Sequence, residues 1–230
     1  MINDFIITII PCYNHGIYLD NTLQSLYNQT FKKIKIIIVD DGSDDLYTLS
    51  VYDRLKSNSN ITIIYKTNSG PAAARNLGFN HLISSFILII DADDMIESTF
   101  VEKALKVMEM NPNVGAVSAW ALCFGFEDYV WYPQGGTLKD FLLSTTCPSC
   151  ALIRREAWLS AEGFDESFII GYEDWDFWIR LTKKGWIVYI INEILYYYLQ
   201  KAKSRVTETF SRHAEIYKVI VEKHPDVFQQ

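Results

Sequence analysis

The hydrophobic positions in the first half of the chain fall into short β-branched runs that alternate with amphipathic segments. Each run is almost entirely apolar and ends at a cluster of turn residues, which is typical of a strand buried on both faces of a sheet. Between the runs, apolar residues such as Leu19, Leu23 and Leu26 recur at helical spacing. The predicted strands are 5–10, 34–39, 61–65 and 86–90, and the predicted helices are 19–27, 71–82 and 99–110.

The second half of the chain is less regular. Residues 125–146 contain aromatic residues and the Gly135-Gly136 pair but no clear period, so we predict a loop or lid there. No internal repeat or linker divides the sequence, and its 230 residues suit a single domain. The predicted strands of this half are 114–124, 151–153 and 187–191, and the predicted helices are 155–161, 174–184 and 205–223.

Composition and charge narrow the class of protein. Hydrophobic residues make up 49% of the chain and charged residues 21%, which is the profile of a globular protein. The 28 acidic and 21 basic residues give a formal net charge of −7, which argues against a nucleic-acid partner. No apolar segment reaches the roughly 18 to 20 residues that cross a bilayer, and the N-terminus lacks the features of a signal peptide. We therefore expect a cytoplasmic protein with no transmembrane segment, while peripheral association with a membrane stays open.

An acidic tetrapeptide follows one of the predicted strands. Asp91, Asp93 and Asp94 come directly after the apolar run 86–90, where carboxylates repel one another and lose hydration. A hard divalent cation such as Mg²⁺ or Mn²⁺ would relieve this repulsion and leave coordination sites for phosphate oxygens. The pattern therefore favours a metal-dependent site for a phosphate-bearing substrate, with a solvated acidic turn as the alternative.

Polar clusters follow the other strands of the predicted sheet as well, and together with the tetrapeptide they are 11–14, 40–43, 68–70 and 91–94. Since ligands of open α/β sheets bind beyond the carboxyl ends of the strands, one crevice would contain all of them. A nucleotide would account for them together, because a carboxylate can accept the imide N–H of uracil, an aspartate can bind ribose hydroxyls and Arg75 can reach a diphosphate. The sequence has neither the Gly-x-Gly-x-x-Gly fingerprint nor the Walker lysine loop, so NAD binding and P-loop hydrolysis are not favoured.

Several motifs occur in a fixed order along the chain. They are Pro11-Cys12-Tyr13-Asn14 with Gln29-Thr30-Phe31, Val39-Asp40-Asp41-Gly42-Ser43, Asn68-Ser69-Gly70 with Ala74-Arg75-Asn76-Leu77-Gly78, Asp91-Ala92-Asp93-Asp94, Arg154-Arg155-Glu156, Gly163-Phe164-Asp165-Glu166 and Gly171-Tyr172-Glu173-Asp174-Trp175-Asp176. In this order, from residue 5 to residue 190, the chain resembles the family 2 glycosyltransferases of the GT-A fold. The resemblance implies an α/β fold with a Rossmann-like, mixed but mainly parallel sheet flanked by helices. It also implies one domain over 1–230, with a nucleotide-sugar-binding half over 1–115, an acceptor and catalytic half over 116–200 and a C-terminal helix within 201–230.

The resemblance also implies a reaction, namely the inverting transfer of a hexosyl-type sugar from a nucleoside diphosphate sugar to a hydroxyl of a glycan or a lipid-linked acceptor. A UDP-sugar is the favoured donor, because Asp41 would face the base. Mn²⁺ or Mg²⁺ would assist, held chiefly by Asp93 with help from Asp91 and Asp94. Asp174 would be the general base that removes the proton of the acceptor hydroxyl, with Glu173 beside it in the catalytic pair.

The same resemblance places a nucleotide-sugar site at the carboxyl edge of the sheet. Asp40 and Asp91 would lie near the nucleoside, and Arg75 would lie near the donor. The full set of nucleotide-sugar-binding residues implied in this way is Pro11, Tyr13, Asn14, Asp40, Asp41, Gly70, Arg75, Asp91 and Ala92.

Several alternatives stay open at this point. Glu173 and Asp174 also suit the N-terminus of a helix, where carboxylates favour the macrodipole. A nucleotidyltransferase would have a similar sheet and similar metal carboxylates, and a sugar-binding module could keep the fold without turnover. Residues 198–203 lack the histidine that many family members carry after the last strand, so the candidates to contact the diphosphate instead are Lys201, Lys203 and Arg205.

Overall fold

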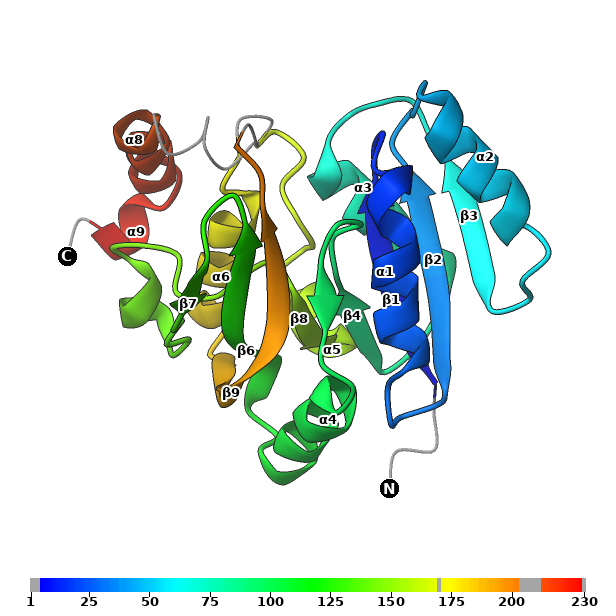
Figure 1. Cartoon of the computed structure of the whole chain (residues 1–230). Helices are drawn as coiled ribbons and strands as arrows, with labels where there is room; N and C mark the ends of the chain where they lie inside the picture. Colours follow the sequence, from blue (N-terminus) through cyan, green and yellow to red (C-terminus); the bar gives the residue numbers. More distant parts are fainter. Residues whose placement is uncertain (1–4, 169–170, 203–211, 229–230) are drawn as a thin grey trace.

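The structure is a computed structural model, and it describes residues 5–168, 171–202 and 212–228. These residues form one nine-stranded sheet with helices on both faces (Figure 1). Along the sheet the strands lie in the order β3-β2-β1-β4-β8-β6-β9-β5, and β7 pairs with β6. The strands are β1 (Ile6–Cys12), β2 (Ile34–Asp40), β3 (Ile61–Tyr65), β4 (Phe86–Ile89), β5 (Met95–Ile96), β6 (Val114–Gly125), β7 (Tyr129–Trp131), β8 (Ala151–Arg154) and β9 (Ile187–Gln200). The helices are α1 (Gly16–Tyr27), α2 (Leu46–Leu55), α3 (Pro71–His81), α4 (Phe100–Met110), the 3₁₀ helix η1 (Leu138–Phe141), α5 (Arg155–Ser160), α6 (Glu173–Lys183), α8 (His213–Lys223) and α9 (Pro225–Phe228).

Most strands of the sheet end at the same edge. β1 pairs in parallel with β2 and with β4, and β2 pairs in parallel with β3. β8 is antiparallel to both β4 and β6, so β6 runs in the direction of β4, and β9 is parallel to β6. The carboxyl ends of β1, β2, β3, β4, β6 and β9 therefore lie along one edge. This mixed but mainly parallel sheet confirms the predicted fold class.

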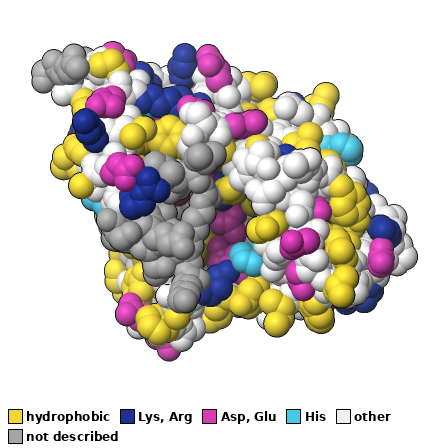
Figure 2. Space-filling view, turned by 90° about the horizontal axis from the view of Figure 1, so that it is seen from above, with side chains coloured by type: hydrophobic (Ala, Val, Ile, Leu, Met, Phe, Trp, Pro, Cys, Tyr) yellow, Lys and Arg dark blue, Asp and Glu magenta, His cyan; other side chains and the backbone are white. Residues whose placement is uncertain are grey.

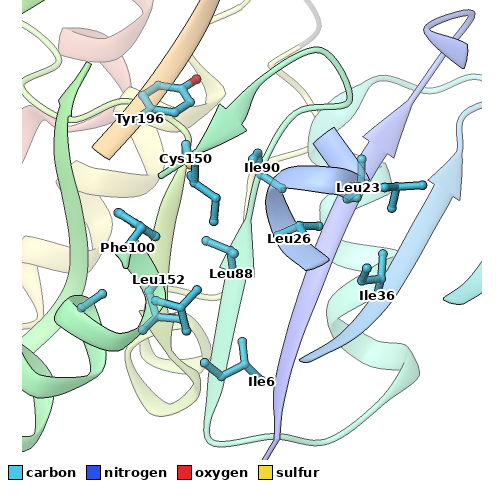
Figure 3. Close-up of a cluster of buried hydrophobic side chains, with 14 of the residues drawn as sticks. Ile6, Leu23, Leu26, Ile36, Leu88, Ile90, Phe100, Cys150, Leu152 and Tyr196 are labelled. Atoms are coloured by element: carbon cyan, nitrogen blue, oxygen red, sulfur yellow. The ribbon is translucent and has the colours of Figure 1, made fainter. Parts of the chain in front are cut away.

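Two buried clusters, one on each face, hold the helices on the sheet. Residues of β1 alternate between them, because Ile6 and Ile10 belong to one cluster and Ile7 and Ile9 belong to the other. Figure 3 shows part of the first cluster, where Leu23 of α1 lies against the strands. Since both faces of the sheet are covered, the strands are apolar along their whole length, and the pattern predicts them well.

Helix α2 is not predicted by the hydrophobic pattern. Its buried residues Val51, Tyr52 and Leu55 recur at helical spacing, but Leu46 at its start is 82% exposed and weakens the pattern. The helix begins instead at a polar signal, because the Asp45 side chain accepts hydrogen bonds from two backbone N–H groups of the first turn. The N-cap, rather than the apolar period, defines this element.

Strand β9 continues to Gln200, past the predicted end at residue 191. Asn192 and Glu193 interrupt the apolar run, yet the ladder to β6 persists because the pairing skips from Ile191 to Ile194. The two polar residues form a bulge, and the strand resumes beyond it.

The remaining differences concern the less regular part of the chain. The segment 125–146 contains β7 and η1 in addition to loops. The predicted helix 205–223 is present as α8 from residue 213, and its residues 205–211 lie outside the described part. Within the three described ranges, no helix combines the length and the apolarity that a membrane span requires.

A buried aspartate ties the C-terminal helices to α6. Asp176 is fully buried, and its carboxylate lies 2.7 Å from Nε of Arg180, 2.8 Å from Nζ of Lys223 and 2.9 Å from Nε2 of His224. Burial alone raises the pKa of Asp176, but the His224 hydrogen bond and the charges of Arg180 and Lys223 outweigh it and lower the pKa to about 2. The charged form is therefore the one that holds α8 and α9 in place.

Replacing this carboxylate tests its contribution to stability. Asp176→Asn should lower the free energy of unfolding by about 3–5 kcal/mol at neutral pH, because it leaves buried cations without their counter-charge. Since the pKa of Asp176 is about 2 in the folded protein and about 3.9 in the unfolded chain, the wild-type advantage should be present above about pH 4 and fall as the pH drops toward 2. Urea denaturation across this pH range measures both effects.

The matched control is Asp20→Asn, which removes a carboxylate that pairs with Arg54 but is 51% exposed. It should change the free energy of unfolding by less than about 1 kcal/mol. Equal losses in the two variants would show that the buried cluster contributes no more than a surface ion pair.

Candidate active site

The polar clusters predicted from the sequence meet at the carboxyl edge of the sheet. Figure 2 views the molecule from above, the side on which the parallel strands end, and shows acidic side chains gathered in a hollow with a histidine and Lys or Arg side chains at its border. The loops after β1, β2 and β4 and the first turns of α3 and α6 contribute to this region. The structure therefore brings together residues from both halves of the sequence.

Each carboxylate of the acidic tetrapeptide has a different partner. Oδ1 of Asp91 lies 2.9 Å from Nη2 of Arg75, and its Oδ2 accepts a hydrogen bond from Ser149 at 3.3 Å. Oδ2 of Asp93 lies 2.6 Å from Nζ of Lys201 and 3.8 Å from Nδ1 of His15. Asp91 and Asp93 thus share one loop but are neutralised by different cations.

The third carboxylate, Asp94, turns away toward β9. It is 1% exposed and accepts hydrogen bonds from the hydroxyl of Tyr196 and, at 3.1 Å, from the backbone N–H of Leu199. Burial, and then the charges of Asp93 and Asp91, raise its pKa well above the usual range. Asp94 therefore fixes the loop to β9 through these hydrogen bonds, and its help in holding a metal stays a prediction.

Ala92 lies between these carboxylates as a buried anchor of the loop. Its side chain is fully buried, and its carbonyl accepts a hydrogen bond from Oγ1 of Thr22 in α1 at 2.9 Å. The backbone turns at this point, since the N–H of Asp94 donates to the carbonyl of Asp91 at 3.2 Å, and this turn leaves Asp91 and Asp93 partly exposed while Ala92 is buried.

Asp40 holds the turn after β2 together. Its Oδ1 accepts hydrogen bonds from the backbone N–H of Ser43 at 3.1 Å and from the hydroxyl of Tyr52 at 3.0 Å. The residue is 3% exposed, so its carboxylate is buried under this turn.

Asp41 connects the same turn to the start of α3. Its carboxylate accepts hydrogen bonds from Nζ of Lys66 and from the backbone N–H groups of Ser69 (3.0 Å) and Gly70 (2.8 Å). Gly70 has φ = 91°, a conformation that suits glycine and lets α3 begin there. A carboxylate offers about four lone-pair sites, and three are used, so one acceptor site of Asp41 is left, although the residue is only 4% exposed.

Residues 11–14 play unequal parts. Pro11 lies buried within β1, where it pairs with β2, whereas Tyr13 is 45% exposed. Asn14 has φ = 53°, and its side-chain oxygen accepts the backbone N–H groups of Asp44 and Asp45. Tyr13 is thus the member of this segment whose ring is available to a ligand, and Asn14 joins two loops.

Arg75 is the centre of a buried ion network. It is 2% exposed, and its Nη1 donates to Oε1 of Glu173 at 2.8 Å while its Nη2 donates to Asp91. The guanidinium also lies 5.1 Å from the centre of the Phe164 ring. Its Nε is buried and finds no hydrogen-bond partner within the described ranges. Arg75 therefore pairs with two carboxylates of the candidate site. Because it is buried, its own side chain is not exposed toward the predicted nucleotide-sugar donor.

The two carboxylates of the Glu173-Asp174 pair face different environments. Glu173 is 7% exposed and is directed to Arg75, whereas Asp174 is partly exposed and its Oδ1 accepts the backbone N–H of Trp175 at 2.8 Å. Burial and the charge of Glu173 raise the pKa of Asp174 to about 7, although Arg75 acts in the opposite direction. Both residues lie in the first turn of α6, where the helix dipole favours the ionised carboxylates and therefore opposes the rise in the pKa of Asp174.

Lys66 and Ser149 contact site carboxylates although the motifs do not include them. They are 25 and 58 residues away from Asp41 and Asp91 in the sequence. No local spacing connects them to those carboxylates, so sequence patterns alone do not identify them.

The donor chemistry of this region fits a hard divalent cation. Among the described residues no group of three or more His, Cys, Asp and Glu side chains forms a metal cluster. Mg²⁺, however, commonly binds through one or two carboxylates and completes its shell with waters and substrate phosphates. Asp91 and Asp93 supply two such carboxylates, both partly exposed in the loop after β4.

The fold, with an acidic cluster at the carboxyl edge of a mainly parallel sheet, is that of the GT-A glycosyltransferases. Residues 7–159, more than half of the chain, match the family model described as Glycosyl transferase family 2. The chain therefore belongs to glycosyl transferase family 2, as the motifs predict.

Curated relatives support the same family. An uncharacterized glycosyltransferase of Rickettsia conorii is 30% identical over 191 residues, which cover 81% of this chain and 31% of the relative. An uncharacterized glycosyltransferase of Haemophilus influenzae is 30% identical over 198 residues, which cover 82% of this chain and 66% of the relative. The chain thus spans less than a third of the length of the first of these relatives.

Solved structures confirm the GT-A fold. Residues 1–349 of S. aureus TarS, in complex with UDP-GlcNAc, superpose with a TM-score of 0.74 at 20% identity, covering 94% of this chain and 66% of that chain. The mannosyltransferase PcManGT from Pyrobaculum calidifontis, in complex with GDP-Man and Mn²⁺, gives 0.64 at 19% identity, covering 92% and 64%. At such identities the likeness concerns the fold.

The Arg75 network can be tested by a substitution that keeps the charge. Arg75→Lys should lower the free energy of unfolding by at least about 2 kcal/mol, because a lysine ammonium cannot replace the planar fork that reaches Asp91 and Glu173 together. Chemical denaturation measures this loss. Arg54→Lys, in an exposed pair, is the control and should change it by less than about 1 kcal/mol. A loss for Arg75→Lys no larger than that of the control would contradict the bridging role.

Proposed function

We propose that this protein is an inverting glycosyltransferase in which Asp174 is the general base. The observation that carries the proposal is the carboxylate of Asp174, which is partly exposed at the start of α6 and has a pKa raised to about 7. A base with this pKa is ionised in part near neutral pH and is a stronger proton acceptor than an ordinary aspartate. The network from Asp91 through Arg75 to Glu173 links the start of α6 to the acidic loop.

The proposed reaction is a direct displacement. The acceptor hydroxyl loses its proton to Oδ of Asp174 while its oxygen attacks the anomeric carbon of the donor sugar. The bond between that carbon and the diphosphate oxygen breaks, and its electron pair leaves with the nucleoside diphosphate. Mn²⁺ or Mg²⁺, held by Asp93 and Asp91, would supply positive charge for the departing diphosphate.

The donor in this proposal is a UDP-sugar, bound by residues 1–115. The acceptor capacity left on Asp41 suits the imide N–H of uracil, and Tyr13, whose ring is exposed, would stack on the base. The complexes of TarS with UDP-GlcNAc and of PcManGT with GDP-Man and Mn²⁺ support a nucleotide sugar and a divalent metal in this fold. Residues 116–200 would bind the acceptor, a glycan or a lipid-linked acceptor, and the reaction would take place in the cytoplasm.

Nucleotide binding provides the first test. Calorimetric titrations with UDP, dTDP and GDP should show tighter binding with Mn²⁺ than with EDTA, and UDP and dTDP should bind more tightly than GDP because they share the imide. Asp93→Ala should lose the Mn²⁺-dependent gain, while Asp20→Asn, on the exposed surface, should retain it. Tightest binding of GDP would contradict the contact with Asp41, and unchanged Mn²⁺ dependence in Asp93→Ala would remove the metal role from that residue.

The second test concerns Asp174. Asp174→Asn keeps the shape of the side chain but cannot take a proton, so transfer should fall by about 10²- to 10⁴-fold while donor affinity stays nearly unchanged. In the wild type, kcat/KM for the donor should decrease as the pH falls below about 7, because the carboxylate becomes protonated. Glu173→Gln should reduce transfer less and stability more, since Glu173 is bound to Arg75.

Product analysis separates the proposal from its alternatives. The expected products are a nucleoside diphosphate and a glycoside of inverted configuration, measured after incubation of UDP-sugars with glycan and lipid-linked acceptors. Release of pyrophosphate would indicate a nucleotidyltransferase instead. Binding of a nucleotide sugar without turnover, equal in wild type and Asp174→Asn, would indicate a non-catalytic module.

A further inference from the structure

Lys201 places a cation directly on the proposed metal-binding carboxylate. The residue follows the last residue of β9, and its Nζ lies 2.6 Å from Oδ2 of Asp93. Nζ also donates to Nε2 of His15 at 3.0 Å and lies 5.1 Å from the centre of the Tyr18 ring. The ammonium is therefore surrounded by an anion, a hydrogen-bond acceptor and the face of an aromatic ring.

These contacts go beyond those of an ordinary surface ion pair. They join three segments that are distant in the sequence. Lys201 follows the end of β9, and its partners lie in the loop after β4 and in the loop after β1 with the start of α1. An ammonium has only donors, so Nε2 of His15 must accept this hydrogen bond. The segments thus form a site for a single positive charge next to Asp93.

The two cations of the acidic loop differ in their freedom to move. Arg75 is 2% exposed and holds two carboxylates at once, so it cannot leave Asp91 without breaking the network. The Lys201 side chain is 24% exposed and carries its charge on a flexible four-carbon stem. Lys201 is the cation that another charge can displace.

We propose that Lys201 is an exchangeable counter-ion of the donor site, which occupies Asp93 until a divalent cation arrives and then contacts the donor diphosphate. The inference rests on the proposed function, since it assumes a metal-bound nucleoside diphosphate. A divalent cation at Asp93 repels the ammonium, and the incoming diphosphate supplies the nearest new anion for it. Metal and nucleotide therefore bind with positive coupling: the metal alone has to compete with Lys201, and the diphosphate removes that competition.

The test uses Lys201→Met, which keeps the length of the side chain and removes the charge. Free Mn²⁺ is titrated into the nucleotide-free protein and followed by electron paramagnetic resonance, and UDP binding is measured by calorimetry at saturating Mn²⁺. Lys201→Met should bind Mn²⁺ alone about tenfold more tightly than the wild type and should bind UDP about tenfold more weakly. The opposite signs of the two changes exclude a general loss of structure as their cause.

Two further variants complete the design. Lys103→Met removes a lysine that pairs with Glu193 away from the site, and it should leave both affinities unchanged. Lys201→Arg keeps the charge and should keep the weak binding of free Mn²⁺. An unchanged or weaker Mn²⁺ affinity in Lys201→Met would overturn the competition at Asp93, and an unchanged UDP affinity would overturn the contact with the diphosphate.

Failure of the proposed function has a different signature. If neither the wild type nor any variant binds UDP, dTDP or GDP with Mn²⁺, the nucleotide-sugar proposal fails, and the diphosphate contact of Lys201 fails with it. The titration of Mn²⁺ alone does not depend on a nucleotide, so it still decides whether Lys201 competes for Asp93.

Discussion

A buried guanidinium, that of Arg75, connects the acidic loop after β4 to the start of α6 at the carboxyl edge of the sheet. Arg75 projects from α3 and bonds at once to Asp91, after β4, and to Glu173, at the start of α6. Removing such a charge from water costs several kcal/mol, and only well-placed opposite charges offset that cost. The position of α6 relative to the acidic loop is therefore set by Arg75, and so is the position of Asp174, which follows Glu173 directly.

Helix α6 carries two aspartates whose pKa values are shifted in opposite directions. Asp174 has its pKa raised to about 7, so ionising it costs stability: its contribution is fully present below about pH 4 and is lost as the pH rises through 7. Asp176, two residues further on, has its pKa lowered to about 2 and stabilises the fold in its charged form. The ion pairs of Asp176 anchor α6, the same helix that carries Asp174, whose ionisation costs stability.

The sequence predicts the fold more completely than it predicts the contacts of the site. Strands covered on both faces are nearly continuous apolar runs, so β1 to β4 are found at their predicted positions, whereas β9 crosses Asn192 and Glu193 because its partner strand, rather than its own pattern, keeps it extended. The motifs also predict that their polar residues meet at the carboxyl edge of the sheet, and the structure brings them together there. They do not reveal that Arg75 bonds to Glu173, 98 residues away, because that contact depends on how the halves pack.

The arrangement of the site follows from the topology of the sheet. Two antiparallel steps, from β4 to β8 and from β8 to β6, restore the direction of the first strands, so β9 ends at the edge where β1, β2 and β4 end. The last residue of β9 therefore delivers Lys201 to the loop that carries Asp93. With only one antiparallel step, β9 would end at the edge of the sheet opposite to the one where β4 ends, and Lys201 would lie far from Asp93. The reversal by β8 thus joins the C-terminal part of the chain to the acidic loop, and it makes the Lys201–Asp93 contact a consequence of the fold rather than of local sequence.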